Sequence, residues 1–288
     1  MKRLFLLFAI ILSVFAFSNT VLSRNNDNFV SIYPFEKVKQ GQTIFVEIVS
    51  KAVFKNPHIV FDNENIKIFN QKNGIYRGLI GISAVEKPGR HKIIITDDTG
   101  KLCEEKFINV VATGFPIQNI VISGKKGGLE ATKYELAKVQ KSKFSLLDCS
   151  YWISPPFNTP TKGCIISVYG LNRYHNGIST GDFHKGLDIK APQGQRINAI
   201  SSGKVTIAEK FRLHGGTVAI DHGQGMVSFY LHMSKISVKE GAIVNAGQKI
   251  GEVGATGFAT GPHLHWGLYI NGIPVNPMEF WIKKVNKC

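Results

Sequence analysis

The sequence is poor in cysteine and in acidic side chains, and each deficit limits what the chain can be. Its four cysteines, in 288 residues, include no C-x-x-C pair, which argues against a cysteine-ligated zinc site. Asp and Glu number 20 against 35 Lys and Arg, which gives a formal net charge of +15. A surface with this charge attracts polyanions. The basic residues are scattered and accompany no recognition motif, so we do not expect nucleic acid as a partner.

Long apolar runs are also scarce, because the sequence contains only one, at residues 4–17. Lys2 and Arg3 precede this run and small residues follow it, with candidate cleavage positions after Ser18 and Ser23. The pattern is typical of a secretory signal peptide, here residues 1–23, and the run is short for a membrane-spanning helix. The alternative is an uncleaved membrane anchor. We expect an exported, monomeric protein of the periplasm, cell envelope or extracellular space, without a membrane span once the signal is removed.

Export changes how the charge and the cysteines are interpreted. Outside the cytoplasm, the polyanions that a basic surface meets are anionic envelope polymers. Export also permits disulfides. Cys149 and Cys164 would close a short loop, but four cysteines allow three pairings and the sequence does not choose among them. The cysteines are Cys103, Cys149, Cys164 and Cys288.

The first half of the chain carries the signals of a β-sandwich followed by a linker. Residues 28–113 contain about seven short apolar runs with turn signals between them, which predicts an immunoglobulin-like sandwich that serves as a positioning or substrate-docking module. Residues 114–150 form a linker marked by Gly124, Gly127 and Gly128. Within it, residues 130–143 are rich in lysine and in helix formers with a sparse apolar stripe, which predicts a short solvated helix.

Residues 151–288 again show short strands and glycine turns, and no long helix fits them. Turns are predicted at 222–225 and at Asn271-Gly272, and residues 173–183 are predicted to be a polar loop. The chain as a whole is therefore predicted to be all-β, with the sandwich, the linker helix and a C-terminal antiparallel β-sheet domain in that order.

A histidine and an aspartate flank a glycine at the start of one of these strands. On a strand, residues two apart share a face, so His184, Gly186 and Asp188 are expected to point the same way. Gly186 adds no side chain and leaves room for something held between its neighbours. An imidazole and a carboxylate suit Zn²⁺, but a structural zinc needs four protein ligands and this stretch supplies two.

A second histidine pair lies on a later strand, after the glycine-rich residues 253–261. His263 and His265 share a face, and one of them is expected to complete a three-ligand site with an open position for water, the arrangement of catalytic zinc. Zinc in such a site lowers the pKa of its bound water to about 7. The remaining histidine and His232 are candidates for the base and for a donor to the developing oxyanion.

Three segments together resemble the signatures of the lysostaphin-type (LytM-like) zinc endopeptidases of peptidoglycan. They are His184-Lys185-Gly186-Leu187-Asp188, Tyr230-Leu231-His232 and Gly261-Pro262-His263-Leu264-His265. The resemblance covers roughly residues 156–281. It implies one zinc per chain held by His184, Asp188 and His265, catalytic roles for His232 and His263, and a metallopeptidase domain built on a twisted antiparallel sheet. The implied reaction is hydrolysis of stem peptides or cross-links of the cell wall.

Two other functions compete with this hypothesis. The first is a non-catalytic wall-binding regulator of another hydrolase, but such relatives typically lack ligands or catalytic histidines, and this chain keeps all five. The second is an adhesin-like protein in which the sandwich dominates. The sequence leaves open whether the bond cut joins D-alanine to a diamino acid or lies in a glycine bridge.

Overall fold

The computed structural model describes residues 21–288 apart from 26–27, 35, 51–56, 72, 122–128, 153–156 and 281–287. The predicted signal segment therefore falls almost entirely outside the described residues. Its last three positions, from Val21 onward, belong to the first strand of a sheet. No helix in the described ranges is both long enough and apolar enough to cross a membrane.

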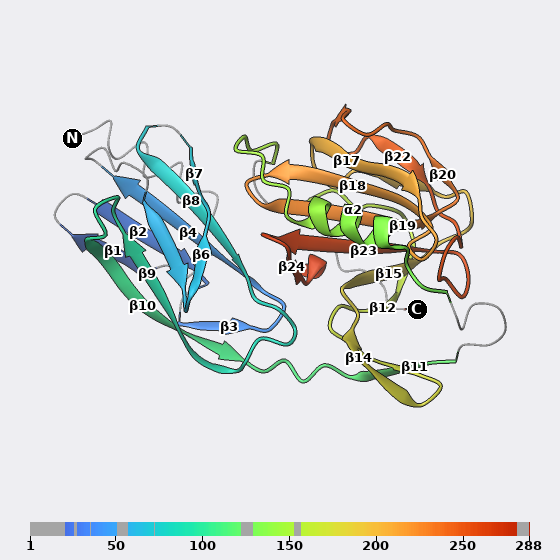
Figure 1. Ribbon diagram of the computed structural model, residues 1–288, viewed down its shortest axis with the longest axis horizontal. Coiled ribbons are helices and arrows are strands. Elements are labelled where there is room, and N and C mark those ends of the chain that lie inside the picture. The colour runs from blue at the N-terminus through green and yellow to red at the C-terminus, as the bar shows by residue number, and fades with distance from the viewer. Residues whose placement is uncertain are drawn as a thin grey trace.

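Two five-stranded sheets form the first half of the molecule (Figure 1). One has the order β1 (Val21–Asn25), β2 (Asn28–Tyr33), β4 (Thr43–Ser50), β8 (Ile75–Gly81) and β7 (Ile68–Asn70). The other has the order β3 (Lys37–Lys39), β10 (Leu102–Val111), β9 (Gly89–Thr96), β5 (His58–Phe61) and β6 (Glu64–Ile66).

The two sheets share one apolar core, which makes this half a β-sandwich. Alternate residues of β9, among them Ile93 and Ile95, are fully buried and pack in the same cluster as Ile44 and Val46 of β4 in the other sheet. This alternation is what the period of a strand produces when one face is covered. The structure has more strands than the seven expected, and the immunoglobulin-like assignment stays a prediction.

The second half is built on one eight-stranded sheet. Its order is β12 (Cys164–Ser167), β15 (Gly186–Lys190), β23 (His263–Ile270), β19 (Met226–Met233), β18 (Gly216–Gly223), β17 (Gly203–Lys210) and β21 (Ile243–Val244), with β24 (Ile273–Val275) also on β23. All these neighbours are antiparallel, so the all-β prediction is confirmed.

The central strand β23 has two different faces. Leu264, Trp266 and Leu268 are fully buried in the main core of this half. His263 and His265 alternate with them along the strand and therefore point to the opposite face. The short strands β16 (Arg196–Asn198), β22 (Lys249–Glu252) and β20 (Lys235–Ile236) form a small sheet beside the large one.

Residues 173–183, predicted to be a loop, instead form most of a hairpin. β13 (Asn172–His175) pairs with β14 (Ile178–Phe183), and β11 (Ile117–Ile120) adds a third strand. Asn176 and Gly177 connect the hairpin with φ values of 50° and 84°. An Asn-Gly pair with positive φ at both positions is the preferred two-residue hairpin turn, and the polarity of the flanking residues concealed this signal.

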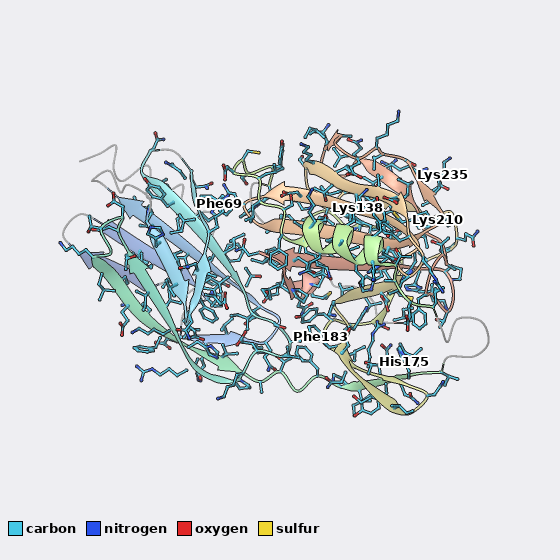
Figure 2. The ribbon with its side chains drawn as sticks, in the orientation of Figure 1. Phe69, Lys138, His175, Phe183, Lys210 and Lys235 are labelled. Carbon is cyan, nitrogen blue, oxygen red and sulfur yellow. A yellow bond between two sulfur atoms is a disulfide. The ribbon has the colours of Figure 1, made fainter. Side chains whose placement is uncertain are left out.

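Helix α2 (Lys133–Lys143) begins with a capping box formed by Thr132 and Glu135. The expectation that this helix is solvated is wrong for one side, because Glu135, Val139 and Ser142 are buried. Val139 packs on the second face of the large sheet, in a cluster with Phe229 and Tyr269. Lys138, labelled in Figure 2, binds carboxylates of the sheet domain, with Glu209 2.8 Å away.

The sandwich and the sheet domain are in contact (Figure 1). The hydroxyl of Tyr169 accepts the N–H of Ala84 at 3.0 Å and donates to the carbonyl of Pro274 at 2.7 Å. Leu79 of β8 is buried in the core of the sheet domain. The short 3-10 helix η2 (Pro277–Phe280) lies at the same boundary, where Glu279 accepts the N–H of Thr43 at 2.9 Å.

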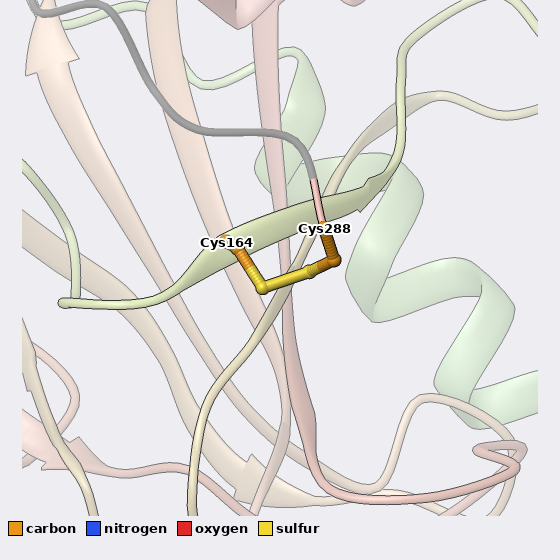
Figure 3. The surroundings of a disulfide bond; sticks show 2 residues. All are labelled: Cys164 and Cys288. Carbon is orange, nitrogen blue, oxygen red and sulfur yellow. A yellow bond between two sulfur atoms is a disulfide. The ribbon is translucent and has the colours of Figure 1, made fainter.

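One disulfide joins Cys164 of β12 to Cys288, 124 residues away in the sequence (Figure 3). This bond selects one of the pairings that the sequence left open and leaves Cys149 as an exposed free thiol. The short loop between Cys149 and Cys164 is therefore not closed by a disulfide.

Candidate functional site

Two histidines and one aspartate converge where β15 pairs with β23. The antiparallel register places Asp188 opposite His265, and His184 reaches the same point from just before β15. The Oδ1 atom of Asp188 lies 2.9 Å from Nε2 of His184 and 2.8 Å from Nδ1 of His265. The two nitrogens are 3.0 Å apart. Within the described ranges, this is the one group of three such side chains whose ligand atoms all lie within 4.8 Å of one another.

The hydrogen bonds around this cluster leave acceptors facing one another. Nδ1 of His184 donates its proton to the carbonyl oxygen of Val168, 2.8 Å away. When Nε2 carries no proton, it directs a lone pair at the carboxylate of Asp188, which can only accept. A cation between these groups relieves the conflict, and two imidazoles with one carboxylate are typical zinc ligands. The donor set therefore fits a zinc ion held by three protein ligands.

Gly186 is required here by close packing. A Cβ atom at this position would lie 2.5 Å from the carbonyl oxygen of Trp266 and 2.9 Å from Nε2 of His265. The space that the glycine leaves is therefore taken by the imidazole from the neighbouring strand, which reaches the cluster because nothing stands in its way. A side chain at position 186 would displace the backbone of Trp266 or the imidazole of His265.

Burial and neighbouring charges set the protonation states of the cluster. Burial by itself raises the pKa of Asp188, but electrostatic and hydrogen-bonding interactions with the imidazoles of His184 and His265 hold that pKa well below its usual range. Burial lowers the pKa of His265 to about 4. At neutral pH the cluster thus presents an ionised carboxylate and a neutral imidazole, the forms that bind a metal.

Two more histidines stand beside the cluster. Nε2 of His263 is 3.9 Å from Oδ1 of Asp188, and the ring centroids of His232 and His263 are 4.9 Å apart. Nδ1 of His232 donates to the carbonyl oxygen of Thr256, and Nδ1 of His263 donates to that of Gly261, each at 2.9 Å. Each ring therefore offers Nε2 as an acceptor. Burial, with the charges of His263 and His265, lowers the pKa of His232 to about 3, so this ring is neutral at pH 7.

The backbone of His232 is held in an uncommon conformation. Its φ value is 64°, in the left-handed region that a residue with a side chain seldom adopts. Its N–H donates to the carbonyl oxygen of His214 at 3.1 Å, which ties it to the 211–215 loop. Such positions persist where the surrounding structure imposes them, and they concentrate at functional sites.

The 211–215 loop is in turn fixed by α2. The carboxylate of Glu135 accepts the N–H groups of Leu213 and His214 at 3.1 Å and 2.9 Å, and it also binds Nδ1 of His214. Burial tends to raise the pKa of Glu135, but these hydrogen bonds lower it. The carbonyl of Leu213 accepts the N–H of Phe258 at 2.8 Å. A side chain of the linker helix thus supports two loops beside His232.

The structure brings all five residues predicted from the sequence to one place, while their division into ligands and catalytic groups stays a prediction. Sequence reasoning missed the carbonyls of Val168 and Thr256, because backbone groups leave no side-chain signal. It also missed Glu135, because a carboxylate within a short predicted helix gives no sign of hydrogen bonds to a distant loop. His175, labelled in Figure 2, lies on the hairpin with its ring centroid 5.8 Å from that of Phe258.

Comparison with known proteins gives consistent matches over this site. Residues 182–277 match the family model described as Peptidase family M23. The DD-carboxypeptidase/endopeptidase Mpg of Neisseria meningitidis is 42% identical over 115 residues, which cover 40% of this chain and 26% of that protein. The peptidoglycan DD-endopeptidase ShyA of Vibrio cholerae is 43% identical over 119 residues, which cover 41% of this chain and 28% of that protein. The chain thus spans about a quarter of the length of these curated relatives.

A solved structure resembles more of the chain. It is that of a Pseudomonas aeruginosa protein assigned to peptidase M23, with 27% identity and a TM-score of 0.61. The alignment covers 84% of this chain and 93% of that one. The likeness therefore extends beyond the segment that matches the family model and includes part of the sandwich half.

Proposed function

The chain belongs to peptidase family M23, and on that premise we propose that it is an exported zinc endopeptidase that hydrolyses cross-links or stem peptides of bacterial peptidoglycan. The observation that carries the proposal is the convergence of His184, Asp188 and His265 on one point, with His232 and His263 beside it. A relative named as a peptidoglycan DD-endopeptidase supports the same substrate class. The net charge of +15 suits an anionic envelope as surroundings.

The metal site divides the chemistry between the ion and the protein. His184, Asp188 and His265 would hold zinc, which when bound supplies Lewis acidity and a bound water of lowered pKa. His232 and His263 have Nδ1 occupied by a backbone carbonyl, so each has only Nε2 with which to accept a proton. A ring that has taken a proton from the attacking water becomes a donor, able to stabilise the oxyanion or to protonate the leaving amine.

Digestion of purified sacculi tests this function. Zinc-loaded protein is expected to release muropeptides with new peptide ends, identified by mass spectrometry. Asp188→Ala is expected to lose zinc and activity together. His263→Ala is expected to keep about one zinc per chain and to lose activity by about 10²- to 10⁴-fold, the usual contribution of a general acid or base.

Two results would contradict the proposal. Binding to sacculi with an unchanged muropeptide profile would identify a non-catalytic wall-binding protein. Full activity of His263→Ala would show that the roles within the histidine pair are assigned wrongly. His58→Ala, an exposed histidine of the sandwich, is the matched control and is expected to behave as the wild type.

A further inference from the structure

One arginine next to the metal cluster makes no hydrogen bond with its guanidinium among the described residues. Nη2 of Arg173 lies 3.7 Å from Oδ2 of Asp188, beyond hydrogen-bonding distance but close enough for an ion pair. Its Nε atom is buried without a partner in the described part of the chain. The side chain as a whole is 22% exposed. The buried Nε–H donor of this fixed cation is thus left without a hydrogen-bond acceptor among the described residues.

Such a group is expensive to keep inside a protein and needs an explanation. Asp188 offsets the positive charge but accepts no hydrogen bond from this guanidinium, because its Oδ2 atom is 3.7 Å from Nη2. With zinc bound, the charges of the ion, Asp188 and Arg173 sum to two positive charges, and the nearby carboxylate of Asp182 is itself paired with Lys185 at 2.9 Å. An anion on the substrate would offset part of that positive charge.

The strand that carries Arg173 faces the site. β13 pairs with β11 without any shift of register, so Arg173 and His175 share one face of the strand. His175 packs against Phe258 of the glycine-rich loop, across from the hairpin. Arg173 reaches Asp188 from the same face. The guanidinium therefore lies on the side of the hairpin that borders the cluster of His184, Asp188 and His265.

We propose that Arg173 is a specificity-determining residue that binds a carboxylate of the substrate next to the scissile bond. This inference rests on the proposed function and narrows it. A planar guanidinium recognises a carboxylate through two parallel hydrogen bonds. A bond between D-alanine and the amine of a diamino acid has such a group, when the amine-bearing carbon keeps a free carboxylate. A glycine bridge has none there, so Arg173 favours the first kind of cross-link.

Three synthetic peptides of equal length test the assignment. The first has a D-alanyl–diaminopimelate bond and a free carboxylate on the amine-bearing carbon. The second has that carboxylate amidated, and the third has glycine in place of diaminopimelate. The wild type is expected to favour the first over the second by about 10- to 100-fold in kcat/KM, the range for a charge-assisted hydrogen bond. Arg173→Gln is expected to abolish this preference, and Arg173→Lys to keep part of it.

Binding and metal content separate recognition from support of Asp188. Uncleavable reduced-amide analogues of the first two peptides are titrated into zinc-loaded protein by calorimetry, and the Kd ratio is expected to follow the kcat/KM ratio. Zinc content is expected to stay at about one per chain in both variants. Arg196→Gln, which removes an arginine from β16, controls for net charge and is expected to keep the preference.

The outcomes are distinct. If Arg173→Gln lowers kcat/KM equally on both diaminopimelate peptides, or if the variant loses its zinc, the proposal is overturned and Arg173 is a positioning residue for Asp188. A wild type without preference between the free and amidated peptides would overturn it as well. A wild type that cleaves no peptide and no sacculi would refute the proposed function instead, and the analogue titration would still measure the carboxylate preference.

Discussion

Removing the carboxylate of Glu135 tests whether the linker helix is part of the catalytic domain. Glu135→Ala leaves the N–H groups of Leu213 and His214, and Nδ1 of His214, without their acceptor. Each buried donor that loses its partner costs about 1–3 kcal/mol. The side chain of His214 is 21% exposed, so water can replace part of the hydrogen bonding that Glu135 provides. We therefore expect the free energy of unfolding to fall by about 3 kcal/mol.

The same change is expected to reach the chemistry through the 211–215 loop. His214 accepts the N–H of His232 and Leu213 accepts that of Phe258, so a loosened loop shifts both neighbours of the site. A small displacement of a catalytic group lowers kcat more than it weakens substrate binding, and we expect a loss of roughly 10-fold or more in kcat with KM little changed.

The assay is urea unfolding of the zinc-loaded protein alongside steady-state kinetics. Leu136→Ala is the control, because that side chain lies on the same helix and is 55% exposed, and its effect is expected to stay within about 0.5 kcal/mol. If Glu135→Ala costs no more stability than Leu136→Ala, the carboxylate does not anchor the loop. If stability falls while kcat is unchanged, the loop does not position His232.

Three further predictions concern the metal, pH and the disulfide. Adding zinc to the metal-free protein is expected to raise the Tm of His263→Ala but not of Asp188→Asn, because zinc stabilises the folded state only of a variant that binds it. An equal rise in both variants would contradict the assigned metal-binding residues. Burial lowers the pKa of His222 to about 4. Between about pH 6.5 and 4, His222 binds a proton in the unfolded chain but stays neutral in the folded protein. The free energy of unfolding is therefore largest above this window and falls by up to about 3 kcal/mol as the pH drops through it. His222→Gln should flatten this part of the urea-unfolding profile, and an unchanged slope would refute the reasoning. Cys288→Ser opens a loop with a sequence separation of 124 residues, and we expect it to cost about 4 kcal/mol of unfolding free energy, with Cys149→Ser near neutral; similar midpoints in urea for the two would count against it.

Local patterns were enough to predict the class of fold. Apolar alternation predicted a β-sandwich followed by an antiparallel sheet, and Asn271-Gly272 predicted the turn between β23 and β24, which the structure confirms with positive φ at both residues. The same kind of turn at Asn176-Gly177 was missed, because the strands beside it are polar and mostly exposed. Hydrophobic alternation is weak evidence where a hairpin covers a site instead of filling a core.

The sequence by itself determined which side chains the site contains, because motif spacing and the period of a strand put His263 and His265 on one face. Only the tertiary structure decided which of them meets Asp188, since the register between β15 and β23 places His265 opposite that carboxylate and His263 opposite Lys190. Tertiary contacts also decided that Cys164 pairs with Cys288, that Glu135 holds a loop far away in the sequence, and that Arg173 lies beside Asp188. These are contacts between distant segments, and periodicity within a strand or helix carries no information about which distant segment lies next to it.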